Sequence, residues 1–349
     1  MRTDGGMDRV PPRAPGALPV AWTGRWAGLP WSGGLSPAQM APGRRRWRPL
    51  LAWLALLLGG LFLAGLAAPL IYAALLDLLP EARWPFSRIF NRTAMVIAAL
   101  LLWLLREPLG WSAMPALFAG RSAAGKIAEV AAGFAAALLG GAAAVSAAWS
   151  LGLLGPALAP YSFFAGRTAS AFIGAFVVGG IEETTFRGLM LVSLAATVGF
   201  PAAVVASSGA YSLVHLLASD PALGREGFSI VAGISYLVHA VGRQIEPASL
   251  RPLFGIFLCG VVAALVVRRR GTLYLAIGLH AGWAFAFQVL RHATRPLVEI
   301  PGHSYLATHH FLVGTFWAWG GVVVGGIAAL AMASLIGPAR SGRPSPASP

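Results

Sequence analysis

Long apolar runs separated by short polar segments make up the chain from residue 49 to residue 336. A helix needs about 20 apolar residues to cross a bilayer. Only helices and closed barrels span a membrane, because hydrocarbon offers no partner to unpaired backbone groups. The pattern therefore predicts an all-α, polytopic transmembrane helical bundle of about eight spanning helices. We expect these helices at residues 49–78, 92–106, 127–154, 168–195, 201–218, 252–267, 272–290 and 310–336.

Polar segments flank this predicted bundle at 49–336, and one short apolar run interrupts its order. Residues 1–48 are rich in Pro, Gly, Arg and Trp, which predicts a disordered basic cytoplasmic arm. Residues 337–349 predict a disordered tail rich in Pro and Ser. Residues 227–242 carry no charge but number only 16, so we expect a re-entrant or interfacial helix there rather than a full crossing.

The composition supports a membrane protein and disfavours a nucleic-acid-binding one. Of 349 residues, 57% are hydrophobic and 11% are charged, and the mean hydropathy is +0.71. Soluble domains carry about 25% charged residues. The formal net charge is +14, but no basic helix face is interleaved with aromatic residues. We therefore expect membrane lipid, and no nucleic acid, as a partner. The excess of Arg, Ala and Gly is typical of a GC-rich bacterial genome, so we expect a bacterial inner membrane.

The distribution of positive charge predicts the orientation of the bundle. With the N-terminus inside, the cytoplasmic segments hold 16 Lys and Arg residues and the opposite side holds nine. The sharpest local signal is the triple Arg268–Arg270, in a tight turn between two predicted helices. Both termini are therefore predicted to face the cytoplasm.

Three ionisable residues, Glu182, Glu183 and Arg187, lie within the predicted helix 168–195. Three unpaired charges at mid-bilayer would cost about 10 kcal/mol on insertion scales, which is comparable to the stability of a whole domain. Glu183 precedes Arg187 by one helical turn, the favoured order for an ion pair on one face. Glu182 points about 100° away. We expect a buried salt bridge between Glu183 and Arg187, which leaves Glu182 as a functional candidate.

Two histidines lie in two other predicted helices. His215 lies in helix 201–218, with Tyr211 one turn before it on the same face, and His280 lies in helix 272–290. A single helical histidine is more often a hydrogen-bonded core residue than a catalyst. The turn before helix 201–218 is short, however, so that helix is an antiparallel neighbour of the helix that carries Glu182. We therefore expect Glu182, His215 and His280 to converge around one wet pocket within the membrane.

One carboxylate and two imidazoles can activate water in two ways. The Glu182 carboxylate can take a proton from water while a histidine orients that water or stabilises an oxyanion. Glu182, His215 and His280 also match a His₂Glu ligand set for zinc. The sequence has no H-E-x-x-H and no G-x-S-x-G motif. The expected cofactor is therefore either none or a divalent metal such as zinc, and the two mechanisms stay open.

The order of these residues resembles the CPBP family, which contains the type II CAAX prenyl endopeptidases and the bacterial lysostaphin-resistance-protein-A-like or abortive-infection proteins. The family pattern is E-E-x-x-x-R, then F-x-x-x-H, then H-x-x-x-N, on three helices. In this chain the motif positions are Glu182, Glu183 and Arg187, then Tyr211 and His215, then His280 and Ala284. Tyr211 stands in place of the usual Phe and Ala284 in place of the common Asn. The resemblance covers a protease-like core at residues 168–290.

This resemblance implies an eight-helix intramembrane endopeptidase that hydrolyses a peptide bond in a membrane-associated protein or peptide. It implies Glu182 as the general base, with His215 and His280 orienting water and stabilising the oxyanion. Glu183 belongs to the implied catalytic set, and Arg187 and Tyr211 support it. The family has been described both as metalloproteases and as glutamate proteases that need no metal.

Two other functions stay open. Intramembrane carboxylates and histidines also relay protons, as in a proton-coupled transporter, although the sequence shows no repeat of broken helices that would favour one. The second alternative is a non-catalytic scaffold or immunity protein on the same fold. It follows from Ala284, which lacks the side chain that would help to hold an oxyanion. Gln288, one turn further along, is a candidate substitute.

Overall fold

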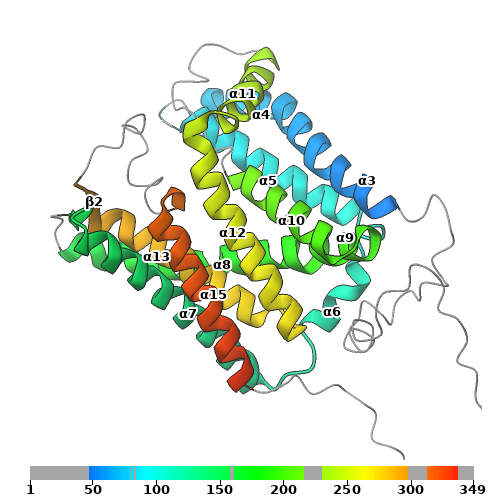
Figure 1. Cartoon of the computed structure of the whole chain (residues 1–349). Coiled ribbons are helices and arrows are strands. Elements are labelled where there is room, and N and C mark those ends of the chain that lie inside the picture. Colours follow the sequence, from blue (N-terminus) through cyan, green and yellow to red (C-terminus); the bar gives the residue numbers. More distant parts are fainter. Residues whose placement is uncertain are drawn as a thin grey trace, which may run out of the picture.

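The computed structural model describes residues 47–79, 81, 84–157, 161–215, 230–297 and 313–336, and these residues form a bundle of helices (Figure 1). The helices and strands are α3 (Arg48–Leu54), the π-helix η1 (Ala55–Gly59), α4 (Gly60–Leu78), α5 (Phe86–Leu104), the short 3₁₀-helix η2 (Trp111–Ala113), α6 (Met114–Leu117), α7 (Ala123–Ser150), β1 (Leu154–Pro156), α8 (Tyr161–Glu183), the π-helix η3 (Thr184–Met190), α9 (Leu191–Val198), α10 (Phe200–His215), α11 (Ile230–Gln244), α12 (Pro247–Arg270), α13 (Tyr274–Ala293), β2 (Thr294–Pro296) and α15 (Phe316–Leu335).

Within the described residues, five helices are long and apolar enough to cross a membrane. They are Arg48–Leu78, Phe86–Leu104, Ala123–Ser150, Ser249–Arg270 and Phe316–Leu335. This confirms an all-α, multi-pass membrane protein. The predicted crossings at 168–195, 201–218 and 272–290 do not meet this test, so the number eight stays a prediction. The orientation and the bacterial inner-membrane location also stay predictions, and the predicted arm and tail lie almost entirely outside the described residues.

The second spanning helix begins earlier than its charges indicate. The predicted start was residue 92, but α5 begins at Phe86, directly after Pro85 in an extended conformation. Arg88 and Arg92 therefore lie inside the helix. Long arginine side chains extend along a helix and keep the charged group in water, so they need not mark a helix boundary.

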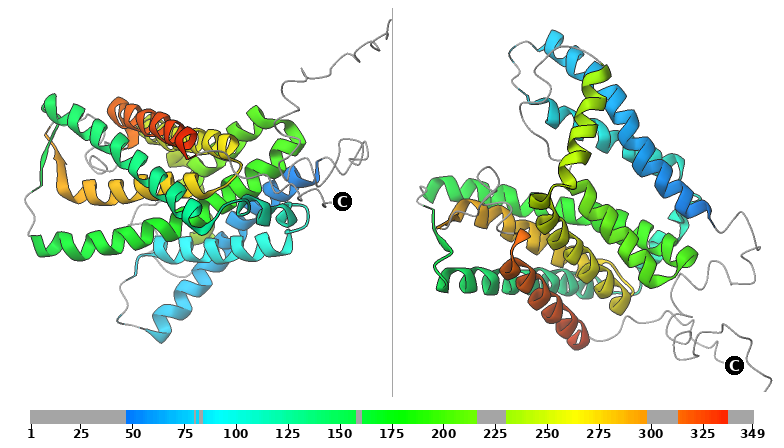
Figure 2. Two further views of the ribbon diagram at one scale, coloured as in Figure 1. Left: turned by 90° about the horizontal axis from the view of Figure 1, so that it is seen from below. Right: turned by 45° about the horizontal axis from the view of Figure 1, so that its top comes forward.

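The helices form two groups, which Figure 2 shows from two further sides. In the first group α7 packs along α13 and α15, and α8 packs along α13. In the second group α4 packs against α5 and α11 around a small cluster that contains Phe86, Phe90 and Tyr236. Helices α10 and α12 pack against each other, and α12 also contacts α15. Helix α11 covers most of the predicted run 227–242, whose placement in the membrane stays a prediction.

Glycines allow the helices of the first group to approach closely. A Cβ atom on Gly278 of α13 would lie 2.0 Å from the carbonyl oxygen of Val130 on α7. A Cβ atom on Gly133 of α7 would lie 2.2 Å from the carbonyl oxygen of Leu275. Lipid supplies no hydrophobic drive for helix association, so membrane helices associate through such small residues. The glycines therefore fix α13 against α7.

A buried ion-pair cluster joins α7 to the end of α12. Glu129 is fully buried, and its carboxylate pairs with Arg121 at 2.7 Å and with Arg270. The Thr272 hydroxyl donates to the same carboxylate at 2.8 Å, and Arg270 donates to the carbonyl of Ala333 at 2.6 Å. Arg270 was expected to act in the turn as a topology signal, but it is buried because Glu129 supplies its counter-charge. The tight turn itself is present at Gly271, which has a positive φ of 71°.

We expect Gly278→Ala to lower the thermal stability of the protein. The added methyl group would meet backbone atoms of α7 that cannot move independently, and overpacking of this kind costs about 1–3 kcal/mol. Gly174→Ala on α8 is the matched control, because a Cβ atom there would meet nothing within 4 Å. That change should be neutral or slightly stabilising, since Gly in a helix is about 0.5–1 kcal/mol worse than Ala. Thermal unfolding of both purified variants tests this, and equal melting temperatures would contradict the packing argument.

Candidate active site

The two adjacent glutamates lie where α8 changes into a π-helix. Helix α8 ends at Glu183, and the π-helical segment η3 follows directly at Thr184–Met190. A continuous α-helix was predicted over 168–195, and this prediction is wrong in that one segment. Short π-helical segments inside α-helices are frequent at functional sites. Residues Phe186–Met190 of η3 are buried, so the wider turn packs into the core directly after the glutamates.

Glu183 and Arg187 form the predicted buried pair. The Nη1 atom of Arg187 lies 3.1 Å from the Oε1 atom of Glu183, and both side chains are only 1% exposed. The Nδ1 atom of His280 lies 2.8 Å from the same Oε1 atom. The Glu183 carboxylate therefore contacts a charged guanidinium from its own helical segment and an imidazole from α13, which offsets much of the cost of burying it.

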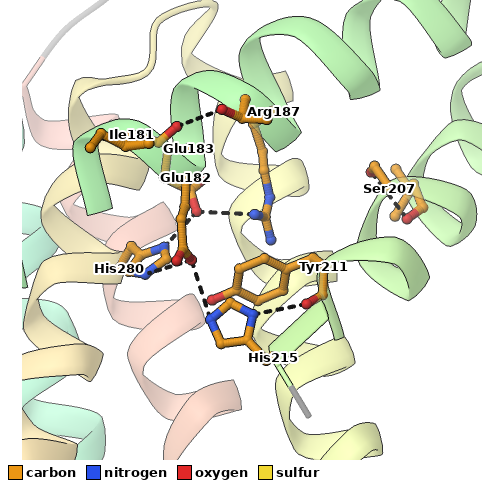
Figure 3. Close-up of polar contacts among 10 residues, drawn as sticks. Ile181, Glu182, Glu183, Arg187, Ser207, Tyr211, His215 and His280 are labelled. Atoms are coloured by element: carbon orange, nitrogen blue, oxygen red, sulfur yellow. Dashed lines mark hydrogen bonds and ion pairs between the residues drawn. The ribbon is translucent and has the colours of Figure 1, made fainter. Parts of the chain in front are cut away.

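Glu182 lies against both histidines (Figure 3). Its Oε2 atom is 3.3 Å from the Nε2 atom of His215 and 3.5 Å from the Nε2 atom of His280. The side chains of Glu182 and His215 are 24% and 30% exposed, in contrast to the closed Glu183. The structure therefore brings together Glu182, His215 and His280 from α8, α10 and α13. The Glu182 side chain is partly exposed, but its Oε2 atom is buried and forms no hydrogen bond with the described residues.

The Nδ1 atoms of both imidazoles are held by acceptors. The Nδ1 atom of His215 lies 2.9 Å from the carbonyl oxygen of Tyr211, one turn before it. A carbonyl oxygen can only accept, so this Nδ1 atom carries the proton. The Nδ1 atom of His280 donates in the same way to the Glu183 carboxylate. Both Nε2 atoms are consequently the ones turned toward Glu182, where they either accept a proton or carry one.

Tyr211 packs between the charged and aromatic groups of the site. The Arg187 guanidinium lies 4.3 Å from the centre of the Tyr211 ring. The ring centre is 4.4 Å from that of His215 and 5.3 Å from that of Phe186. The side chain is 6% exposed. Tyr211 and Arg187 thus support the cluster as neighbours of the Glu and His side chains.

A close approach between α8 and α13 positions His280, and sequence reasoning did not single out the residue responsible. A Cβ atom on Gly179 would lie 3.3 Å from the carbonyl oxygen of Ile277 and 3.5 Å from the Cδ2 atom of His280. The available signal was the Gly-Gly pair directly before Ile181 and the two glutamates. A glycine one turn before a polar helical residue allows the neighbouring helix to come near.

The remaining histidines lie apart from this cluster or outside the described residues. His239 on α11 bonds the carbonyl of Ser235, and His292 at the end of α13 lies 3.4 Å from Arg167. His303, His309 and His310 lie outside the described ranges. Ala284 and Gln288 are half-buried on α13, and no hydrogen bond joins Gln288 to the cluster in the part of the chain that the structure describes.

The predicted metal ligands do not form a metal site in this arrangement. Among the described residues, no group of three or more His, Cys, Asp or Glu side chains is arranged to hold a metal ion. In the set Glu182, His215 and His280, both imidazole nitrogens approach the same oxygen atom of the glutamate. The cofactor, either none or a divalent metal such as zinc, stays a prediction.

Comparison with known proteins agrees with this geometry. Residues 164–286 match the family model described as type II CAAX prenyl endopeptidase Rce1-like. No curated protein and no solved structure matches the chain. The matched segment includes the glutamate pair, both histidines and position 284, and it lies in a multi-pass helical bundle. Residues 164–286 are therefore similar to a type II CAAX prenyl endopeptidase Rce1-like domain, and the resemblance to the CPBP family of intramembrane proteases is confirmed.

Proposed function

We propose that the chain is an intramembrane endopeptidase in which Glu182 is the general base that activates water. Its substrate is a membrane-associated peptide or protein. The observation that supports this proposal is the position of the Glu182 Oε2 atom, 3.3 Å and 3.5 Å from the Nε2 atoms of His215 and His280. These separations are longer than a strong hydrogen bond. The buried Oε2 atom forms no hydrogen bond with the described residues, which leaves it able to accept one from water.

The proposed reaction requires one imidazole to carry protons on both nitrogens, because the Nδ1 atom of each already donates to a fixed acceptor. Glu182 takes a proton from the bound water as the water oxygen bonds to the carbonyl carbon of the substrate. The π pair of the carbonyl moves onto its oxygen, and a protonated Nε2 atom of His215 or His280 stabilises the resulting oxyanion. The carbon–nitrogen bond then breaks, and the proton held by Glu182 passes to the leaving amine. The products are a carboxylic acid and an amine, and Glu182 returns to its ionised form.

Glu183 and Arg187 hold this arrangement in place. The Glu183 carboxylate fixes Nδ1 of His280 as a donor, which directs the Nε2 atom of His280 toward Glu182. Arg187 supplies a counter-charge to the buried Glu183 carboxylate. Glu183 and Arg187 are therefore proposed as positioning residues, and Glu182, His215 and His280 as the residues that take part in the reaction.

A non-catalytic scaffold on the same fold is the second candidate. It is favoured by Ala284, which places a methyl group one turn after His280, where an amide would be available to an oxyanion. A scaffold requires the shape of the site but not its acid–base chemistry. Replacement of Glu182 by the isosteric Gln therefore separates the two functions, because only the protease loses its activity.

Glu182→Gln should abolish hydrolysis. The assay uses the purified full chain in lipid nanodiscs with a library of fluorescence-quenched, lipid-anchored peptides, with and without a chelator. Removal of a general base lowers the rate about 10²- to 10⁴-fold. Glu107→Gln, in the exposed turn after α5, is the matched control and should cleave like the unmodified protein. Unchanged cleavage by Glu182→Gln would exclude the proposed mechanism. The chelator arm distinguishes a metal-dependent from a metal-independent reaction.

Glu183→Gln should destabilise the fold, in contrast to Glu182→Gln. It would leave the Arg187 guanidinium buried without a counter-charge, and breaking a buried pair in this way costs about 3–5 kcal/mol. Glu182 is partly exposed, so its replacement should change stability by less than about 1 kcal/mol. Denaturation of both variants measures the difference. In a double-mutant cycle, Glu183→Gln with Arg187→Met should be less destabilised than Glu183→Gln alone. Equal stability of the two single variants would refute the assigned positioning role.

A further inference from the structure

The hydroxyl group of Tyr211 lies on the side of its ring that faces the Glu182 and His215 side chains (Figure 3). Tyr72 and Tyr274 donate their hydroxyl hydrogens to the carbonyl oxygens of Trp84 and Phe118. No hydrogen bond of the Tyr211 hydroxyl is found in the part of the chain that the structure describes. The hydroxyl end of the Tyr211 side chain points toward the Glu182 carboxylate and the His215 ring (Figure 3). The Tyr211 side chain is only 6% exposed, but its hydroxyl oxygen is not fully enclosed, so it can meet a group that enters the site.

The packing of the ring fixes where this hydroxyl points. The Arg187 guanidinium lies 4.3 Å from the ring centre, and the rings of His215 and Phe186 lie 4.4 Å and 5.3 Å away. The centre of the His280 ring is 5.9 Å away. A phenylalanine would satisfy every one of these ring contacts. The hydroxyl is therefore unnecessary for packing, and its orientation is set in advance by groups that do not depend on it.

A fixed donor at this place suits one step of the reaction. When water adds to a carbonyl, the negative charge develops on the carbonyl oxygen, and a preorganised donor in a site of low polarity stabilises that charge strongly. A phenol remains protonated near neutral pH, so it can donate without giving up its proton. On α13, Ala284 has no polar side chain with which to provide a donor from the turn after His280.

We propose that the Tyr211 O–H group donates a hydrogen bond to the carbonyl oxygen of the scissile peptide bond and holds the oxyanion formed when water adds. In this step the water oxygen bonds to the carbonyl carbon, the carbonyl π pair moves to oxygen, and Glu182 receives the proton of the water. The phenol proton stays on Tyr211. This inference rests on the proposed proteolytic function and assigns one further catalytic residue to it.

Tyr211→Phe tests the inference, because it removes only the hydroxyl and keeps the ring contacts. In the nanodisc assay with the quenched peptide that the unmodified protein cleaves fastest, kcat should fall about 10²- to 10³-fold, as for the loss of one oxyanion donor. KM should change less than about threefold, because the bond strengthens only as the charge develops. The melting temperature should be unchanged. A kcat within about threefold of the unmodified value, or a loss confined to KM, would overturn the proposal.

Tyr274→Phe is the matched control. It deletes a hydroxyl from α13, the helix of His280, but that hydroxyl bonds the carbonyl of Phe118 away from the cluster. Cleavage by this variant should match that of the unmodified protein. A loss of kcat as large as that of Tyr211→Phe would show a general effect of hydroxyl deletion and would overturn the proposal.

Restoring a donor from the neighbouring helix is the second arm. Ala284→Asn places an amide one turn after His280, on the same helical face. In the Tyr211→Phe background it should raise kcat at least about tenfold. A double variant no faster than Tyr211→Phe would overturn the assignment of a hydrogen bond. Failure of the proposed function has a different signature, because peptide cleavage would then be absent or independent of Glu182. Glu182-dependent cleavage that tolerates Tyr211→Phe overturns this inference alone.

Discussion

A carboxylate inside a bilayer is stable only beside partners, and the Glu183 carboxylate has two. Arg187 reaches it from one turn along the same helical segment, and His280 reaches it from α13. Each ionised group left alone at this depth would cost several kcal/mol. The contact therefore links helices that are far apart in the sequence. Because His280 is held through its Nδ1 atom, the orientation of its Nε2 atom depends on the Glu183 carboxylate. The distance between this Nε2 atom and Glu182 therefore depends on Glu183 as well.

This polar contact requires the helices to lie closer together than ordinary side chains allow. Gly179 brings α8 to α13, and Gly278 brings α13 to α7. Large residues at these places would move α13 outward, and a hydrogen bond of 2.8 Å between His280 and Glu183 does not tolerate such a shift. Close packing and buried charge are thus coupled in this bundle. The glycines let the helices come close enough for the charged groups to make contact, and the charged groups determine which faces of the helices meet.

The sequence predicts those parts of this protein that depend on local pattern. Apolar run length predicts the five helices that are long and apolar enough to cross a membrane, and the one-turn spacing of Glu183 and Arg187 predicts their pair. The cost of an unpaired intramembrane charge directs attention to Glu182, which the structure places beside both histidines. These predictions succeed because each depends on residues that are neighbours along one helix.

Features that depend on contacts between residues far apart in the chain could not be predicted from the sequence. Arg270 resembles an exposed turn arginine until Glu129, on another helix, is known to lie against it. The π-helical turn after Glu183 has no local signature, since Thr184 and Thr185 are compatible with an ordinary α-helix. The start of α5 was misplaced because Arg92 carries a charge, although its long side chain permits a helical position. In each case the local sequence is compatible with two structures, and contacts with residues far away in the sequence decide which of them forms.

The two adjacent glutamates have different roles in this proposal, because Glu183 is a buried structural residue and Glu182 is the general base. Consecutive helical residues point about 100° apart, so Glu183 turns into the core while Glu182 turns toward the buried His280 and the partly exposed His215. If Tyr211 donates as proposed, α10 supplies the donor that a polar side chain at position 284 of α13 would otherwise supply. A tyrosine at position 211 together with an alanine at position 284 is consistent with such an exchange. The number of donors around the reacting carbonyl, rather than the identity of any one residue, would then be the quantity that the site must keep.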